Sequence, residues 1–222
     1  MRVVSLVPSM TETLLEWGIE PVACTRFCEQ PDLRHVGGTK DPDTAAIADL
    51  EPELVIVDAE ENRREDYEAL LSAGLDVEAL HIRSLGDVAS QLQPLAERLG
   101  VNWTMPELPA AVPTTSAAFV PIWRRPWMAL GAPTYGTSLL ESVGVDNVFA
   151  ADHDTYPETT LEDVAARQPD LVLAPSEPYP FRERHRDELE SVATTMFVDG
   201  KDLLWWGSRT SGAIGRLAGL LE

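Results

Sequence analysis

Tryptophan, arginine and lysine residues gather in a few short loops of this 222-residue chain. The segments that we expect to follow strands are residues 8–9, 27–28, 38–40, 60–62, 123–127, 176–179 and 205–206. Four of the six tryptophans lie in them, together with Arg124, Arg125 and Lys40. Aromatic rings beside cations suit a flat ligand that carries negative groups. Large aromatics also fill the ends of α/β units, and for a single tryptophan both interpretations stand.

Acidic residues in the same loops are the candidates for catalysis. Glu60, Glu61 and Glu177 could act as general bases, although loop carboxylates in so acidic a chain are more often simply solvated. The sequence contains no G-x-S-x-G, Walker, G-x-G-x-x-G or H-E-x-x-H pattern. We therefore favour binding without catalysis.

Cysteine and histidine give little sign of a metal site. Cys24 and Cys28 are the two cysteines, and their C-x3-C spacing is unusual for metal or redox motifs. Cys24 alternates with Val22 and is expected in the core, and Cys28 in a loop. The four histidines are scattered singly: His35, His81, His153 and His185. We predict no metal held by side chains alone and no covalent cofactor.

The charge balance limits the possible partners. The formal net charge is −20, from 37 acidic and 17 basic side chains, so nucleic acid and anionic membranes should be repelled. Solubility is the simplest reason for the excess. No apolar run approaches the roughly 20 residues of a membrane span, and the chain shows no leader before Arg2. If Met1 is the native start, we expect a cytoplasmic protein.

An internal repeat predicts two similar α/β lobes. Residues 43–61 are matched by residues 160–177, with Pro52 aligned to Pro169. Each copy opens on a helix N-cap, Asp43 or Thr160, and closes with an apolar run typical of a buried parallel strand. Residues 13–19 also resemble residues 138–145, with one inserted residue. The alternative is chance similarity between ordinary βα units.

Periodicity and turn residues predict the remaining elements. We expect strands at residues 3–7, 22–25, 77–81, 117–122 and 195–198, and helices from Ser9 or Thr11 to Trp17 and at 64–73, 87–99, 137–143, 179–189 and 210–221. Residues 123–127 and 203–207 are expected to be loops.

The expected boundary between the lobes follows the helix at 87–99. Its apolar stripe is Val88, Leu92, Leu95 and Leu99, and Gly100 ends it. Prolines 106, 109 and 113 then predict a semi-rigid connector. The expected division is an N-terminal lobe at 1–84, a helix and connector at 85–116, and a C-terminal lobe at 117–222.

Five motifs occur in one order along the chain: RVVSLVPSMTE, VGGTKDPD, EPELVIVDAEEN, IWRRPW and YPETTLEDVAARQPDLVLAPSEP. Together they resemble the iron-chelate and vitamin B12 substrate-binding proteins with a helical backbone, most of all the cobalamin-binding branch. The resemblance implies a class III periplasmic-binding-protein-like fold: two Rossmann-like α/β lobes with mainly parallel sheets, joined by an interlobe helix that is shorter here. It also implies a metal chelate bound between the lobes, namely cobalamin or another corrinoid, haem, or a ferric siderophore.

The resemblance also suggests the ligand-binding positions. The matching residues are Pro8, Phe27, Glu61, Asn62, Trp123, Arg124, Trp127, Tyr156, Asp202, Trp205 and Trp206. Lys40, from the strand-end loops, completes the predicted set.

Family members deliver their ligand to an ATP-binding-cassette (ABC) permease, which binds one glutamate on each lobe. Glu162 matches on the second lobe, but Ala45 occupies the position on the first. We expect a monomer, with the two lobes less rigidly coupled than in relatives. A cytoplasmic enzyme or chaperone that handles a corrinoid or iron chelate is an alternative function, and a non-binding interaction module is another.

Overall fold

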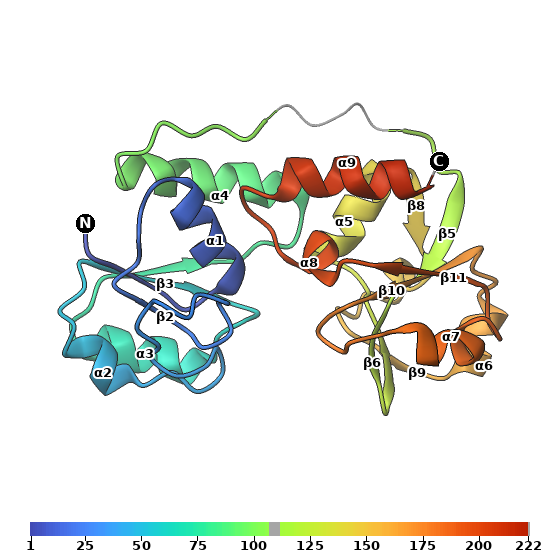
Figure 1. Ribbon diagram of the computed structural model, residues 1–222, viewed down its shortest axis with the longest axis horizontal. Helices are drawn as coiled ribbons and strands as arrows, with labels where there is room; N and C mark the ends of the chain where they lie inside the picture. Colours follow the sequence, from blue (N-terminus) through green and yellow to red (C-terminus); the bar gives the residue numbers. More distant parts are fainter. Residues whose placement is uncertain (107–111, 222) are drawn as a thin grey trace. The chain divides into compact units, whose positions relative to one another are not determined.

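The computed structural model describes residues 1–106 and 112–221, which form two compact units (Figure 1). The N-terminal unit contains Met1–Ile82, Asp87–Met105 and Trp206–Ser208. The C-terminal unit contains Arg83–Gly86 and the described parts of Pro106–Trp205 and Arg209–Glu222. The helix expected at 87–99 thus packs with the N-terminal unit. Residues 107–111 of the expected connector lie outside the described residues.

A four-stranded parallel sheet forms the centre of the N-terminal unit. Its order is β2-β1-β3-β4, with β1 at Val3–Ser5, β2 at Ala23–Cys24, β3 at Leu54–Asp58 and β4 at Val77–Leu80. Every residue of β1, β2 and β3 is buried, which explains why their sequences read as short apolar runs.

The helices of the N-terminal unit are α1 (Pro8–Glu16), α2 (Thr44–Ala48), α3 (Arg64–Ser72) and, from Asp87 onward, α4 (Leu85–Arg98). Helix α1 begins at Pro8 because proline suits the first helical position. The expected caps Ser9 and Thr11 therefore lie inside the helix, and strand β1 ends at Ser5, earlier than predicted. Gly100 follows α4 with φ +74, as its predicted role of helix terminator requires.

The C-terminal unit repeats the same sheet. Its order is β11-β10-β5-β8, with β5 at Ser116–Phe119, β8 at Val145–Asn147, β10 at Leu171–Pro175 and β11 at Thr194–Val198. All pairs are parallel. In both units the first strand of the sheet lies next to the second on one side and the third on the other. The helices here are α5 (Tyr135–Ser142), α6 (Leu161–Ala166), α7 (Arg186–Leu189), α8 (Gly200–Leu204) and α9 (Thr210–Leu221), with 3-10 turns η1 (Ala150–Asp152) and η2 (Glu183–His185).

Matching hydrogen bonds and backbone conformations in the two copies confirm the repeat. Asp43 Oδ1 accepts from Ala46 N at 2.9 Å at the start of α2, and Thr160 Oγ1 accepts from Asp163 N at 3.1 Å at the start of α6. After each helix comes a left-handed residue, Glu51 (φ 46) or Gln168 (φ 55). Buried prolines follow at the next position, and strand β3 or β10 comes after them.

Four predictions for the C-terminal unit were wrong. Residues 123–127 are not a loop: they lie in a hairpin of β6 (Pro121–Arg124) and β7 (Trp127–Ala129), which pairs with β9 (Glu158–Thr159) in a small antiparallel sheet. The predicted strand at 117–122 is accordingly divided between β5 and β6. The predicted loop at 203–207 begins inside α8, which Asp199 caps through Lys201 N at 3.0 Å. The predicted helix at 179–189 is only η2 and α7.

Among the described residues, no helix is long and apolar enough to cross a membrane.

Candidate functional site

The carboxyl ends of parallel strands are the usual place for ligands in α/β sheets, at the point where the strand order reverses. That point lies between β1 and β3 in the N-terminal unit and between β5 and β10 in the C-terminal unit. Most of the residues predicted to bind ligand follow these strands or their neighbours β2 and β11. We describe each unit separately.

Asn62 joins three loops at the reversal point of the N-terminal sheet. Its Oδ1 accepts from Asp58 N at 2.9 Å, and its Nδ2 donates to Thr39 O at 2.9 Å and to Leu6 O at 3.3 Å. The side chain is only 7% exposed. Asn62 therefore positions the loops after β1 and β3 and the Thr39 loop relative to one another.

Asp58 ends strand β3 directly beneath these loops. It is 2% exposed, and its Oδ1 accepts from Glu60 N at 2.9 Å and Glu61 N at 3.2 Å. Among the described residues, Oδ2 has no hydrogen-bond partner. Burial raises the pKa of Asp58 to about 6. We did not select this residue from the sequence, although an aspartate at the end of an apolar strand, four positions before an asparagine, was visible there.

The other predicted residues of the N-terminal unit differ in exposure. Lys40 Nζ donates to Glu60 O, so this pair spans the Thr39 loop and the loop after β3. Phe27 is 51% exposed, with the Arg26 guanidinium 4.8 Å from its ring centre, and Glu61 is exposed. Pro8 and Trp206 are buried. The loops thus present one aromatic and several polar groups to solvent.

The β6–β7 hairpin carries Trp123, Arg124 and Trp127 into an aromatic cluster. Trp127 stacks on Phe181, with ring centres 6.0 Å apart and ring planes inclined by 6°. Trp123 packs edge-on against Tyr179, with ring centres 5.6 Å apart. His185 contacts Tyr179 at 5.5 Å and accepts from Arg182 N through Nδ1. Burial, followed by the nearby Arg184 and Arg124, lowers its pKa, so the ring is neutral at pH 7. The sequence did not reveal this role of His185.

Arg124, in the hairpin, and Tyr156, beside it, are also predicted ligand-binding residues. Arg124 Nε donates to Glu188 Oε2 at 2.8 Å, which fixes the guanidinium beside the aromatic cluster. Tyr156 is 37% exposed, next to Thr155, whose carbonyl accepts from Gly131 N at the end of the hairpin. Trp123, within β6, is 43% exposed.

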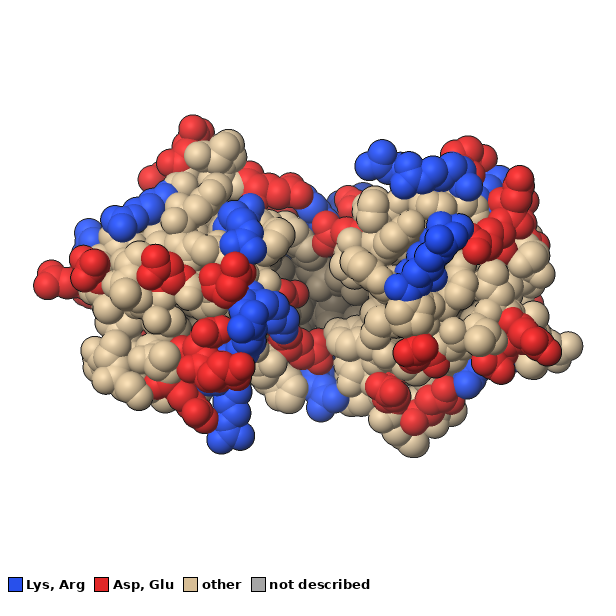
Figure 2. Space-filling model, turned by 90° about the horizontal axis from the view of Figure 1, so that it is seen from below, with Lys and Arg blue, Asp and Glu red and all other residues tan. Residues whose placement is uncertain are grey.

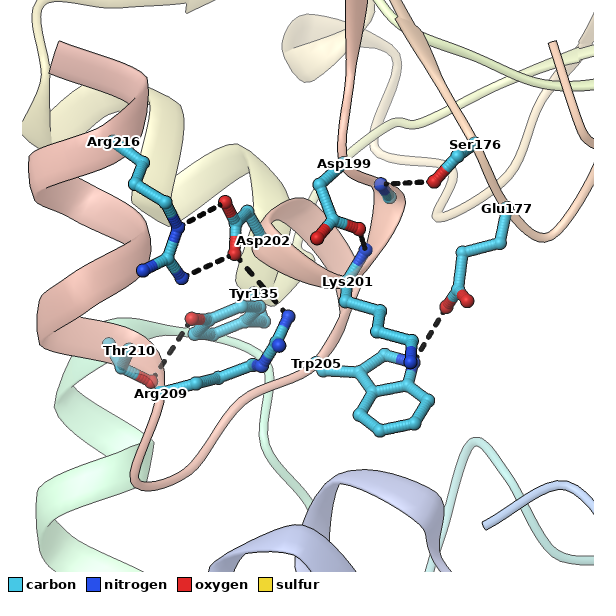
Figure 3. Close-up of polar contacts among 11 residues, drawn as sticks. Tyr135, Ser176, Glu177, Asp199, Lys201, Asp202, Trp205, Arg209, Thr210 and Arg216 are labelled. Atoms are coloured by element: carbon cyan, nitrogen blue, oxygen red, sulfur yellow. Dashed lines mark hydrogen bonds and ion pairs between the residues drawn. The ribbon is translucent and has the colours of Figure 1, made fainter. Parts of the chain in front are cut away.

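Trp205 is held by charged groups from two strand-end loops (Figure 3). Its Nε1 donates to Glu177 Oε1 at 2.6 Å. Lys201 Nζ lies 4.5 Å and Arg209 Cζ 5.7 Å from the ring centre, distances typical of cation–π contacts. Glu177 follows β10 and Lys201 follows β11, so the indole is fixed at the carboxyl edge of this sheet.

Asp202 lies beside Trp205, where it accepts hydrogen bonds from two arginines (Figure 3). It is 4% exposed and accepts from Arg216 through both carboxylate oxygens at 2.7 Å, and from Arg209 Nη1 at 3.3 Å. Because Arg209 also contacts the Trp205 ring, Asp202 positions the ring indirectly. A direct contact between Asp202 and ligand stays a prediction.

Charged side chains and metal-ligating groups are the other features that could mark a site. Figure 2 shows acidic side chains spread over the visible face of both units, with basic groups among them. Within residues 1–106 and 112–221, no group of three or more His, Cys, Asp or Glu side chains could hold a metal ion.

Two parallel α/β sheets of identical strand order, each with its candidate residues at the carboxyl edge, define a bilobal binding-protein fold. The chain matches the periplasmic binding protein family over residues 3–194. It therefore belongs to that family.

Known proteins agree with this assignment. The chain is 24% identical over 189 residues to the vitamin B12-binding protein of Salmonella choleraesuis (strain SC-B67), covering 78% of this chain and 71% of the relative. It is similar in fold to the periplasmic vitamin B12 binding protein of Vibrio cholerae, with a TM-score of 0.75 and 18% sequence identity. The match covers 99% of this chain and 96% of that protein. A periplasmic haem-binding protein from Pseudomonas aeruginosa has a TM-score of 0.78 and 20% sequence identity. That match covers 99% of this chain and 91% of the other protein.

Proposed function

We propose that this protein binds a flat metal chelate, such as a corrinoid, a haem or a ferric siderophore, without transforming it. The observation that carries the proposal is the exposure of Phe27, Trp123 and Tyr156, which are 51%, 43% and 37% exposed. All three belong to the set of residues predicted to bind ligand. Exposed aromatic side chains are costly in water, and they commonly mark binding surfaces.

The relatives support the same class of ligand, since their names state binding of vitamin B12 or haem. Trp205 is a further proposed contact, because Glu177 and Lys201 fix its half-buried ring at the edge of the C-terminal sheet. We propose that Lys40, Glu61 and Arg124 contact polar groups at the ligand's rim. Buried Asn62, Asp202 and Trp206 would act by positioning the loops and rings.

Titration with cobalamin, haemin and a ferric siderophore, followed by tryptophan fluorescence, tests the proposal. We expect quenching by at least one of them, and weaker affinity by about tenfold or more for Trp123→Ala and Tyr156→Ala. Trp17→Phe is the matched control, because Trp17 packs against Trp103 within the N-terminal unit, with ring centres 5.4 Å apart and ring planes tilted by 50°. No binding of any chelate by the wild-type protein would reject this function.

We further propose that the protein serves an ABC permease through Glu162. This glutamate is exposed in the first turn of α6. The repeat places Ala45 at the corresponding position of α2. Binding to vesicles that contain the cognate permease should weaken in Glu162→Ala and strengthen in Ala45→Glu, with chelate affinity unchanged. Equal permease binding by all three proteins would contradict the docking role.

A further inference from the structure

His185 is a buried titratable group to which the proposed function gives no part. It is the last residue of η2 and is 4% exposed. Its Nδ1 accepts from Arg182 N at 3.1 Å, so the ring ties the start of the turn to its end. This bond is half of a capping box, in which a glutamate or glutamine usually supplies the acceptor. Histidine differs from both, because it takes up a proton in mild acid and then has no lone pair left to accept with.

Positive groups surround the imidazole ring. Arg184 Nε lies 3.2 Å from Nε2. Among the described residues, the other charged or titratable groups that face the ring are Arg182 at the start of η2, Arg124 from β6, Glu188 from α7 and Tyr179 from the segment before the turn. Glu188 is the single carboxylate of this set, and it already pairs with Arg124 at 2.8 Å. An imidazolium here would be buried beside three guanidinium groups, which is unfavourable.

The ring of His185 is also packed into the aromatic cluster. Its centre lies 5.5 Å from that of Tyr179 and 5.7 Å from that of Phe181, which it meets edge-on. Tyr179 packs in turn against Trp123, a proposed ligand contact, and Phe181 stacks on Trp127. A change at His185 therefore reaches both tryptophans of the hairpin through direct ring contacts.

We propose that His185 is an acid-sensitive latch: its neutral ring holds η2 and the aromatic cluster together, and its protonation releases them. When the ring takes up a proton, Arg182 N loses its acceptor and the surrounding arginines repel the imidazolium. The turn then opens, and Tyr179 separates from the ring. Because folding lowers the pKa of His185 from its ordinary value of 6.5, the stabilisation by the neutral ring is complete above that value and is lost as the pH falls below it.

Hydrogen exchange of the ligand-free protein tests the latch. In the wild type, the protection of residues 179–189, corrected for the intrinsic rate, should fall by about tenfold or more between about pH 7 and pH 5. His185→Gln keeps an acceptor for Arg182 N and cannot titrate, so its protection should change by less than about twofold. His185→Leu has no acceptor and should exchange rapidly at both pH values. The control is His81→Gln, exposed in the N-terminal unit, which should behave as the wild type does.

Two results of this experiment would overturn the latch. One is a wild-type segment that is equally protected at both pH values, and the other is an equal loss of protection in the wild type and in His185→Gln. Titration of the His185 ring by NMR needs no variant. Its midpoint should lie below about 6.5, and a midpoint at or above that value would contradict a latch that folding keeps neutral.

The effect of the latch on the ligand rests on the proposed function, whereas the opening of the turn does not. Titration with cobalamin and haemin at both pH values measures this effect. From neutral to acid pH, affinity should fall more in the wild type than in His185→Gln, because Trp123 loses the support of Tyr179. An equal fall in both proteins would reject control of binding by the latch. Acid-dependent exchange without binding of either chelate would reject the proposed function for these ligands and leave the latch standing.

Discussion

Strand β3 ends at Asp58, and strand β10, its counterpart in the repeat, ends at Pro175. Four residues later the two units have Asn62 and Tyr179. In the N-terminal unit these positions form a hydrogen-bonded clamp between loops. In the C-terminal unit, Tyr179 belongs to an aromatic cluster with Trp123 and Phe181. The backbone plan is repeated, and the chemistry at the strand ends is not.

The comparison shows which part of a repeat is constrained by the fold. Caps, left-handed residues and prolines recur because they set the geometry of each helix–strand unit. The strand ends are free to differ because they do not shape the sheet. The N-terminal edge relies on buried contacts between side chains and backbone, whereas the C-terminal edge relies on half-exposed contacts between side chains. The following predictions test that contrast.

Asn62→Ala should have the largest effect. It leaves Asp58 N–H and the carbonyls of Thr39 and Leu6 without their side-chain partner, and we expect a loss of about 2–4 kcal/mol in unfolding free energy. Hydrogen exchange should show the lost protection in β1, β3 and their loops. Exposed Asn102→Ala is the control, expected within about 0.5 kcal/mol of wild type. Equal loss of protection in β10 and β11 would contradict a clamp confined to the N-terminal unit.

Asp58→Asn should change how stability depends on pH. The folded carboxyl has a pKa of about 6 against an ordinary value of 3.8, so the folded state binds the proton more tightly. The stabilisation that comes from this proton binding is fully present below about pH 4, and it is lost as the pH rises through about 6. The Asn variant cannot ionise. Its unfolding free energy should therefore rise by about 3 kcal/mol relative to that of the wild type between pH 4 and pH 7.5.

Urea unfolding at both pH values measures this difference. Exposed Asp187→Asn is the control. A difference between Asp58→Asn and wild type that is the same at both pH values would show that folding does not raise the pKa of Asp58. The counterpart Pro175 does not titrate, so we expect no such dependence from the C-terminal strand end.

Trp205→Phe should have a smaller effect, about 1 kcal/mol. It removes the bond from Nε1 to Glu177 Oε1 but keeps an aromatic ring, and both side chains remain partly solvated. Trp123→Phe is the matched control, since its described contact is the edge-on packing against Tyr179. A loss as large as that of Asn62→Ala would remove the contrast between the two edges. Urea unfolding followed by circular dichroism gives both values.

The sequence predicted the repeated backbone well because its signals are local. Asp43, Thr160 and the paired prolines each act within a few residues, and both helices begin where predicted. The β6–β7 hairpin was missed because Trp-Arg-Arg-Pro-Trp contains a proline and lacks the usual turn residues, and its pairing with β9 depends on residues about thirty positions away. Helix α8 is short and begins with glycine, so the Asp199 cap was its main signal.

The candidate residues were harder to interpret than the fold. Exposed aromatics such as Trp123 could be found from composition and position. The buried roles of Asn62 and Asp202 could not, because they depend on partners from other segments: Leu6 and Thr39 for the asparagine, Arg216 for the aspartate. Sequence patterns identify which residue types are available, and tertiary contacts decide whether each one faces a ligand or a neighbour.

Replacing the left-handed residues tests the shared backbone and should give the smallest effect. Glu51 and Gln168 have φ of 46° and 55°, a region that costs a residue with a side chain roughly 1 kcal/mol. Glycine adopts it freely but loses more entropy on folding. Glu51→Gly and Gln168→Gly should therefore each raise unfolding free energy by up to about 1 kcal/mol. The exposed Glu53→Gly, outside that region, should lower it, since it also removes the hydrogen bond from Arg2 N to Glu53 Oε2. Because both turns have one geometry, the two changes should share a sign, and opposite signs in urea unfolding would show that the turns are not equivalent.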